Sequence, residues 1–415
     1  MPSTIAWLDS TPEEQRAARE LIALFTQTEG RDELGVGQVR DALGDLLFPG
    51  TSTLQTRARY FLFVPWCYTA GSAAGSTGAE NQRRGERQER YLVQTLKDAH
   101  LEDSAGLIGG RVGPTVKNLP SSIYWSGLQQ YGVLTHATDP SHLGTLTGTD
   151  GDAATELADR NKGDWRPGIP PPPPNFPREV EGGFAMVSEE VEWLAARMTS
   201  ADPDSVLATL LRRRAFIEPS SAFPWHEVDP GDFEELDHAY WFSNAFHGAS
   251  LLYNLLVAEK YDAHESLTRI EYAAETYREL LEGWADEFLV PLHEGLSRWD
   301  IERLWQLVVA VNPNINRRTQ SFVESWCGEV LKADPSHIAD NQRLRRLVRT
   351  REERKGKQSR LINDRLLATW SGASGAGHVA CQRYGTTSLP RAWDHLEVSV
   401  SITGPGCRCQ RWRAG

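Results

Sequence analysis

The chain has 415 residues, enough for about two or three domains of ordinary size, and its 40% hydrophobic content with 14 Trp excludes wholesale disorder. Its net charge of -12, from 44 Lys and Arg against 56 Asp and Glu, excludes a general attraction of the whole molecule to nucleic acid or anionic lipid. The sequence has no signal-peptide pattern, no apolar run of membrane-spanning length and only five scattered Cys, so we expect a cytoplasmic protein without membrane contact.

The first predicted helix begins at Thr11, where a capping hydroxyl, Pro12 and Glu14 follow in the order favoured at a helix N-terminus. A glycine turn comes next, Gly35-Val36-Gly37, and the amphipathic residues after it predict a tight hairpin that feeds a helix. Residues 57–66 form a short aromatic run, and periodicity does not decide whether this run is a helix or a strand.

Loops and a proline-rich stretch follow. Residues 70–88 are predicted to be an exposed loop that enters a helix around 87–100, and we place an N-terminal domain at 1–135. Residues 136–186 include five consecutive prolines, which favour extended polyproline II. This stretch is therefore predicted to be a linker or a long surface excursion, and a spacer role is favoured over a docking site for a partner.

Helical periodicity dominates residues 187–377, which we predict to be a C-terminal helical bundle. Residues 231–260 are apolar on most faces in their second half, which is typical of a central helix. The predicted fold is mainly α, with an N-terminal helical domain that contains the hairpin turn and short extended segments. Residues 378–415 lose all periodicity and are predicted to be a poorly ordered tail. The predicted bundle helices are 187–199, 203–214, 231–260, 264–289, 298–311, 314–333 and 335–353.

Motifs for metals and nucleotide phosphates are not recognisable. His226, His238 and His247 do not have the four-residue spacing of a helical ligand pair, and we interpret His247 as a packing residue. The glycine-rich run 106–113 lacks the Gly-Lys-Ser/Thr end of a phosphate-binding loop. We therefore expect no metal and no cofactor.

Positive charge is concentrated between Arg343 and Arg360, where nine Lys and Arg residues are opposed only by Glu352 and Glu353. A solvated helix face followed by a loop explains this pattern as well as a phosphate-contacting surface does.

Two neighbouring segments suggest DNA binding. An apolar-Gly-apolar-Gly turn is typical of helix-hairpin-helix proteins, in which backbone N–H groups approach a DNA phosphate. Residues 51–59 then supply hydroxyl, amide and guanidinium donors directly before an aromatic run, and an extruded nucleotide needs both kinds of group. The alternative is that the aromatic residues are core and the Arg pair satisfies buried carboxylates such as Asp41 and Asp45. The candidate binding residues are Gly35, Gly37, Arg40, Thr51, Ser52, Thr53, Gln55, Arg57, Arg59, Tyr60, Trp66 and Trp125.

Several strings carry a resemblance to a known family. Residues 3–9 (STIAWLD), 32–37 (DELGVG) and 45–61 (DLLFPGTSTLQTRARYF), with 120–125 (PSSIYW) and 247–249 (HGA), resemble a bacterial family found in phage-defence islands. The resemblance spans roughly residues 3 to 376, and the tail after Gly377 departs from the pattern. It implies an anti-phage DNA glycosylase that removes glucosylated hydroxymethylcytosine by base flipping and leaves an abasic site.

Such a reaction builds positive charge on the sugar, so the site needs a carboxylate. Asp9, Asp41 and Asp45 are the candidates, and the absence of Lys before Lys97 favours a water-using, monofunctional enzyme if the site lies in the first ninety residues. The expected partners are double-stranded phage DNA with modified bases and other defence proteins. The alternatives are a non-catalytic DNA-binding or scaffold subunit of a multi-protein defence complex and, less favoured, a helical adaptor that binds partners through the prolines.

Overall fold

The computed structural model describes residues 33–52, 54–72, 77–99, 106–136, 138–143, 164–213, 224–267, 270 and 272–370. Asp9, Thr53, the helix predicted from Thr11 and the predicted tail 378–415 lie outside the described residues. Within the described ranges the regular elements are helices and there is no strand, so the predicted mainly α fold is confirmed. Leu134 and Trp165 form an isolated antiparallel bridge.

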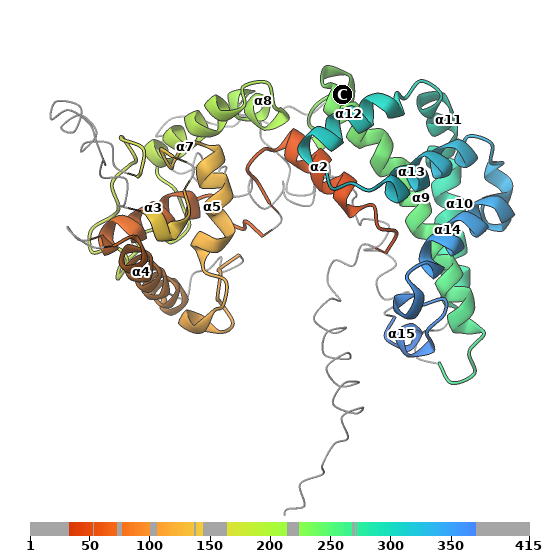
Figure 1. Cartoon of the computed structure of the whole chain (residues 1–415), viewed down its shortest axis with the longest axis horizontal. Coiled ribbons are helices and arrows are strands. Elements are labelled where there is room, and N and C mark those ends of the chain that lie inside the picture. Colours follow the sequence, from red (N-terminus) through yellow and green to blue (C-terminus); the bar gives the residue numbers. More distant parts are fainter. Residues whose placement is uncertain are drawn as a thin grey trace, which may run out of the picture. The chain divides into compact units, whose positions relative to one another are not determined.

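The chain divides into two compact units (Figure 1). Of the described residues, unit 1 takes those within 33–38, 248–293 and 315–370, and unit 2 takes those within 39–247 and 294–314. Each unit combines stretches that are far apart in the sequence, whereas the domains predicted at 1–135 and 187–377 are contiguous. The sequence boundaries near 135 and 186 both lie in the part of the chain that belongs to unit 2.

Unit 2 is built around a helix that is buried on all sides. This helix, α3, covers Tyr60–Gly71, and every residue from Tyr60 to Tyr68 is buried. A helix without an exposed face has no hydrophobic period, which explains why the sequence did not distinguish it from a strand. It packs against α4 and α5. The other α-helices with residues in this unit are α2 (Gly37–Leu47), α4 (Gly78–Asp98), α5 (Pro120–Gln130), α7 (Ser188–Ala201), α8 (Val206–Arg213), α12 (Ile301–Val311), the first half of α9 (Glu234–Asp262) and the end of α11 (Val290–Leu296).

The described part of the proline-rich stretch, residues 164–186, packs against α3. Trp66 Nε1 donates to the carbonyl oxygen of Pro170 at 2.8 Å, and the ring of Phe176 lies 5.9 Å from that of Phe63 and 5.3 Å from that of Trp66. Trp66 and Phe63 thus hold Pro170 and Phe176 against α3, while most of the prolines between them are exposed. The stretch is thus a surface excursion that is held on α3 at two points, and it is not a free spacer.

Unit 1 surrounds the second half of α9, a helix that covers Glu234–Asp262. Nearly every side chain from Ser250 to Ala258 is buried, as expected for a central helix. The segment predicted as one helix at 264–289 begins instead at Ala273, after Tyr272 in a left-handed conformation with φ 56°, and continues through a π-helical turn at Ala285–Leu289. The remaining helices are α10 (Ala273–Trp284), α11 (Val290–Leu296), α13 (Arg317–Val330), α14 (Gln342–Glu353) and α15 (Asp364–Ala368). No helix in the described ranges combines the length and the apolar character needed to cross a membrane.

Candidate nucleic-acid interface

The glycine turn at the start of α2 is held from inside unit 1 by Arg351. Gly35 has a φ of 66°, which L side chains rarely adopt, and a Cβ added there would lie 2.6 Å from the Arg351 guanidinium. That guanidinium donates from Nε to Leu34 O at 2.7 Å and from Nη2 to Gly35 O at 3.0 Å. Gly35 is therefore required by its conformation and by the close approach of a cation that belongs to the protein itself.

Arg351 also joins the turn to the first residues of α13. Its Nη2 donates to Thr319 Oγ1 at 3.1 Å, and Thr319 Oγ1 donates to Gly35 O at 3.3 Å. The guanidinium lies over the ring of Phe322, 5.1 Å from its centroid. The turn, α13 and α14 thus meet around one arginine, which fixes their geometry.

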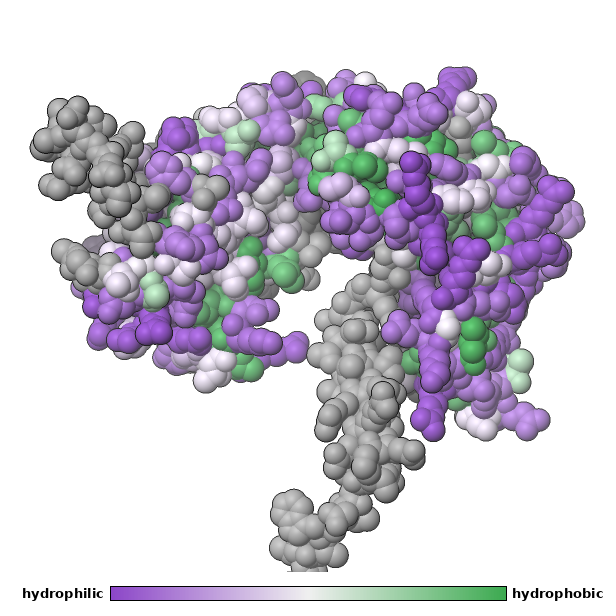
Figure 2. All heavy atoms as spheres, in the orientation of Figure 1, coloured by the Kyte–Doolittle hydropathy of each residue, from purple (hydrophilic) through white to green (hydrophobic). Residues whose placement is uncertain are grey.

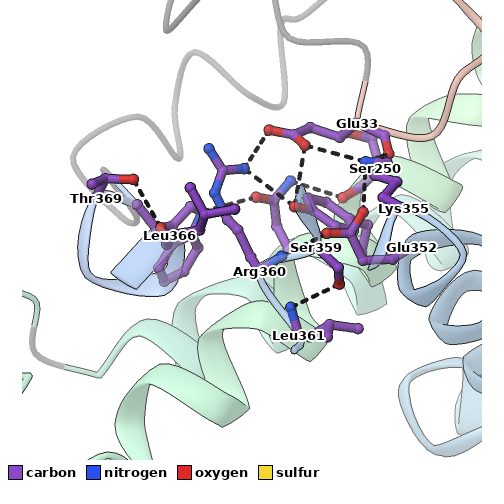
Figure 3. A network of polar contacts seen from close by, with 12 residues as sticks. Glu33, Ser250, Glu352, Lys355, Ser359, Arg360, Leu361, Leu366 and Thr369 are labelled. Atoms are coloured by element: carbon purple, nitrogen blue, oxygen red, sulfur yellow. Dashed lines mark hydrogen bonds and ion pairs between the residues drawn. The ribbon is translucent and has the colours of Figure 1, made fainter. Parts of the chain in front are cut away.

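A second network lies beside this arginine (Figure 3). Arg360 Nη1 donates to Glu33 and, at 3.2 Å, to Tyr253 Oη, while Tyr253 Oη donates to Glu33 Oε2 at 3.3 Å. Lys355 Nζ lies 2.5 Å from Glu352 Oε2, whose side chain is fully buried. Burial, and then the Glu33 carboxylate, raise the pKa of Tyr253 well above its usual value. Arg345 likewise donates to Ala339 O at 2.8 Å and pairs with Glu259. Four of the nine basic residues of segment 343–360 therefore act as internal partners, namely Arg345, Arg351, Lys355 and Arg360.

Other cations of the same segment face solvent. Arg346, Arg349, Arg354 and Lys357 are exposed, and within the part of the chain that the structure describes they make no ion pair. We call these four residues the basic face. Strongly hydrophilic side chains cover the area of unit 1 that holds α14 (Figure 2). Glu353 is the exposed acid among them.

Two further arginines open the neighbouring helix. Arg317 and Arg318 are exposed and occupy the first two positions of α13, after the Asn316 cap. Cations are disfavoured at this end of a helix because the helix dipole is positive there. Their position thus contributes nothing to the stability of the helix, whereas an anion at this place would be favoured.

The predicted catalytic candidates on α2 lie in unit 2, on an exposed side of the helix. Asp41 accepts from Arg40 Nε at 2.8 Å and from Arg40 Nη2 at 2.7 Å, so these two neighbours form an ion pair. Asp45 follows one turn later. Partial desolvation, and then the nearby charge of Asp41, raise the pKa of Asp45. Among the described residues Asp45 accepts no hydrogen bond and makes no ion pair.

The arginines predicted to contact the nucleotide are buried instead. Arg59 is 3% exposed and donates to Gly183 O at 2.7 Å and to Glu190 Oε1 at 2.9 Å. Arg57 is 4% exposed, and its guanidinium lies over the ring of Phe184, 5.0 Å from the centroid. The structure therefore contradicts a surface role for both residues. The carboxylate that pairs with Arg59 comes from α7, not from Asp41 or Asp45.

The predicted stacking residues are part of the same core. Tyr60 is fully buried and its hydroxyl accepts from Ile108 N at 3.1 Å, while the indole of Trp66 donates to Pro170 O. Trp125 is half-buried, donates to Thr138 O at 2.7 Å and packs on Tyr68. Aromatic packing in the interior of unit 2 thus replaces the predicted platform for a base.

The polar candidates between α2 and α3 shape the loop. Gln55 is buried and donates to Gly50 O at 3.2 Å, and Thr51 Oγ1 donates to Phe48 O at 2.8 Å. Ser52 is half-buried. Of the predicted binding residues in unit 2, Arg40, Thr51 and Ser52 are thus partly exposed to solvent. All three lie within eleven residues of Asp41 in the sequence.

A buried carboxyl that the sequence did not single out is Glu89, on α4. It accepts from Ser121 N at 2.6 Å and from Ser121 Oγ at 2.7 Å, and so caps the start of α5. Burial is the main reason that its pKa is raised to about 7. Pro120-Ser121 begins a helix that has no capping residue of its own, and this is the sequence feature that points to an acceptor from elsewhere. The acceptor, Glu89, lies 32 residues earlier, so local sequence does not identify it.

The raised pKa of Glu89 predicts a pH-dependent stability. The pKa of Glu89 in the folded protein lies above the ordinary value of 4.5, so folding favours the neutral carboxyl. The stability that the neutral form contributes is fully present below pH 4.5 and is lost as pH rises towards 7. The free energy of unfolding should fall by about 3 kcal/mol over this range. Glu89→Gln cannot ionise, so we expect it to be more stable than the wild type at pH 8 and similar to it near pH 4.5. Urea unfolding at both pH values measures this, and an equal difference at both would contradict it.

Two histidines of α9, His238 and His247, have a pKa lowered by burial. His238 Nδ1 accepts from Trp299 Nε1 at 2.6 Å, and burial lowers the pKa of His238. Burial also lowers the pKa of His247 to about 4. Within the described ranges, no three His, Cys, Asp or Glu side chains gather as metal ligands.

One comparison with known proteins gives a match. A family model described as "Family of unknown function (DUF6361)" matches residues 2–391. The chain belongs to this family. No curated protein and no solved structure matches the chain. Because the description of DUF6361 carries no activity, the resemblance to a phage-defence glycosylase stays a prediction.

Proposed function

We propose that this DUF6361 protein binds DNA through the basic face of unit 1 and removes a modified base from it. The observation that carries DNA binding is a set of exposed arginines without ion pairs among the described residues, on a chain whose net charge is -12. Unpaired cations that repel one another are stabilised by a polyanion, and the release of counterions from DNA drives such binding. Two more exposed cations, Arg317 and Arg318, lie at the start of α13, which packs against α14, and they also favour binding of a polyanion.

The proposed reaction is hydrolysis of the base–sugar bond. The oxygen of a water molecule bonds to C1′ of the deoxyribose, the C1′–N bond breaks, and the base leaves with the electron pair and takes up a proton. A carboxylate beside the sugar stabilises the positive charge that develops or orients the water. Asp41 and Asp45 support this role because they lie one turn apart and the pKa of Asp45 is raised, a pattern typical of acid–base pairs.

The substrate we propose follows from the resemblance: glucosylated hydroxymethylcytosine in double-stranded phage DNA, in the cytoplasm. The first Lys of the chain is Lys97. The segment that holds Asp41 and Asp45 therefore has no Lys that could act as an amine nucleophile. This favours water as the nucleophile, and hence a monofunctional glycosylase.

The second candidate is a non-catalytic DNA-binding subunit of a multi-protein defence complex. The burial of Arg57, Arg59, Tyr60 and Trp66 favours it, because these groups were expected to enclose the extruded nucleotide. Such a subunit would bind DNA through the basic face and would not need the carboxylates on α2.

Asp45→Asn tests the enzyme proposal. We expect the wild type to convert duplex DNA with one glucosylated hydroxymethylcytosine into alkali-labile strands and to leave plain cytosine intact. Asp45→Asn should lower the rate by about 100-fold or more and bind DNA with unchanged affinity. Asp204→Asn, an exposed acid on another part of unit 2, is the matched control and should retain full activity.

Each result of this assay has a distinct meaning. DNA binding without base release would support the non-catalytic subunit. Base release by Asp45→Asn at the wild-type rate would remove Asp45 from the reaction, and the same variant of Asp41 would then be measured. A wild type that neither binds nor cleaves modified DNA would contradict both candidates.

A further inference from the structure

Helix α4 of unit 2 carries a row of cations that ends on an exposed aromatic ring. Arg83, Arg87 and Tyr91 follow one another at four-residue spacing and are all exposed, with Arg84 beside them. Residues four apart lie on one face of a helix, so these side chains form a continuous row about 12 Å long. The rest of the helix packs inward through Leu92, Val93 and Leu96.

Arg83, Arg84 and Arg87 are exposed and have Glu80 and Glu86 as neighbours on the same helix. Among the described residues none of them makes an ion pair. The nearest acids along the helix have other partners: Glu80 accepts from Thr77 N at 2.9 Å in the capping box, and Glu86 accepts from Gln82 Nε2 at 2.8 Å. The hydrogen bonds from Thr77, and then the charges of Arg84 and Arg83, lower the pKa of Glu80, so these arginines interact with that carboxylate without an ion pair to it.

The aromatic end of the row has a cation of its own. Tyr91 is 45% exposed, an unusual state for a large ring, and the Arg178 guanidinium lies over that ring, 5.6 Å from the centroid. Arg178 is exposed and follows the proline-rich stretch, whose Phe176 is packed on α3. The Tyr91 ring, the arginines of α4 and Arg178 therefore all belong to unit 2, and Arg178 lies over the ring.

We propose that the row Arg83, Arg87, Tyr91 and Arg178 binds single-stranded DNA. Spaced guanidinium groups fit successive phosphates, and an exposed ring among them stacks on a base. Duplex DNA hides the faces of its bases, whereas an unpaired strand offers them, so the ring favours the unpaired form. An acidic protein surface would be attracted by the arginines but would gain nothing specific from the ring.

This inference rests on the proposed function for its ligand, since it takes DNA as the polyanion. It adds a second surface, on unit 2, and a preferred strand state. Base extrusion unpairs DNA locally, so an enzyme that acts on a base benefits from a surface that holds an unpaired strand.

The test measures binding of a fluorescent single-stranded oligonucleotide and of its duplex by anisotropy at several salt concentrations. Arg83→Gln/Arg87→Gln should lower single-strand affinity about tenfold and reduce the salt slope by about 1.4, the value for two phosphates that are no longer neutralised. Tyr91→Ala should lower single-strand affinity about tenfold without changing the slope, and Tyr91→Phe should restore it. Neither Arg83→Gln/Arg87→Gln nor Tyr91→Ala should change duplex affinity by more than about twofold.

Arg212→Gln/Arg213→Gln is the matched control, because it removes the same charge from exposed residues elsewhere in unit 2. An equal loss in this control, or full single-strand affinity in Tyr91→Ala, would overturn the inference. If either result were found while the wild type still bound duplex DNA through the basic face, only this inference would be overturned and the proposed function would remain. A wild type that binds neither form of DNA would contradict both.

Discussion

Replacing Glu190 with Ala is expected to lower the free energy of unfolding by about 3–5 kcal/mol. Glu190 and Arg59 are both 4% exposed on their side chains and 2.9 Å apart, so the variant leaves a buried guanidinium without its counter-charge. It also removes the acceptor for Val187 N, 3.2 Å from Glu190 Oε2, at the start of α7. Urea unfolding at neutral pH measures the loss.

Two comparisons make this prediction specific. Glu189→Ala changes the exposed neighbour of the same type and should stay within about 0.5 kcal/mol of the wild type. Arg59→Met/Glu190→Met removes both charges and should recover much of the lost stability. If Glu190→Ala were as stable as Glu189→Ala, Arg59 would not depend on this pair, and its role in DNA binding would have to be measured directly.

Charge reversal of the basic face is expected to lower duplex affinity by about 100-fold or more. Arg346→Glu/Arg349→Glu/Arg354→Glu replaces three exposed cations with anions that repel phosphates. The slope of affinity against salt should fall by about 0.9 for each phosphate that the protein no longer neutralises. Thermal unfolding should change little, since none of the three side chains has an ion pair to lose among the described residues.

The control for this variant carries the same change of charge. Arg166→Glu/Arg212→Glu/Arg213→Glu reverses three exposed cations of unit 2 that lie outside both proposed surfaces. Its duplex affinity should fall by less than about tenfold, through the change in net charge alone. An equal loss in both triple variants would show that DNA responds to overall charge and not to the basic face.

The sequence predicted elements that have a period or a cap of their own. The second half of α9 is apolar on most faces, and it is the central helix of unit 1. The glycine turn at Gly35 was recognised as a turn because two glycines flank one apolar residue. Local chemistry sufficed for such features, since the residues that decide them are neighbours in the chain.

Functional roles depended on partners that are distant in the sequence. Arg59 looks like a DNA contact until Glu190, 131 residues later, supplies its carboxylate. Arg351 belongs to a basic run, yet it binds the turn at Gly35, 316 residues earlier. The prolines at 170–174 predict an exposed spacer, and most of them are exposed, but Trp66 and Phe63 hold the stretch against α3 at Pro170 and Phe176. No local pattern specifies these pairings, because each is decided by which segments the fold brings together.

We propose that this protein hydrolyses the bond between a modified base and its sugar. Mass spectrometry of the solution after incubation with modified duplex DNA in heavy-oxygen water tests it most directly. We expect free glucosylated hydroxymethylcytosine and one heavy oxygen on the sugar of each abasic site. Duplex DNA that is bound by the basic face but releases no base would contradict it.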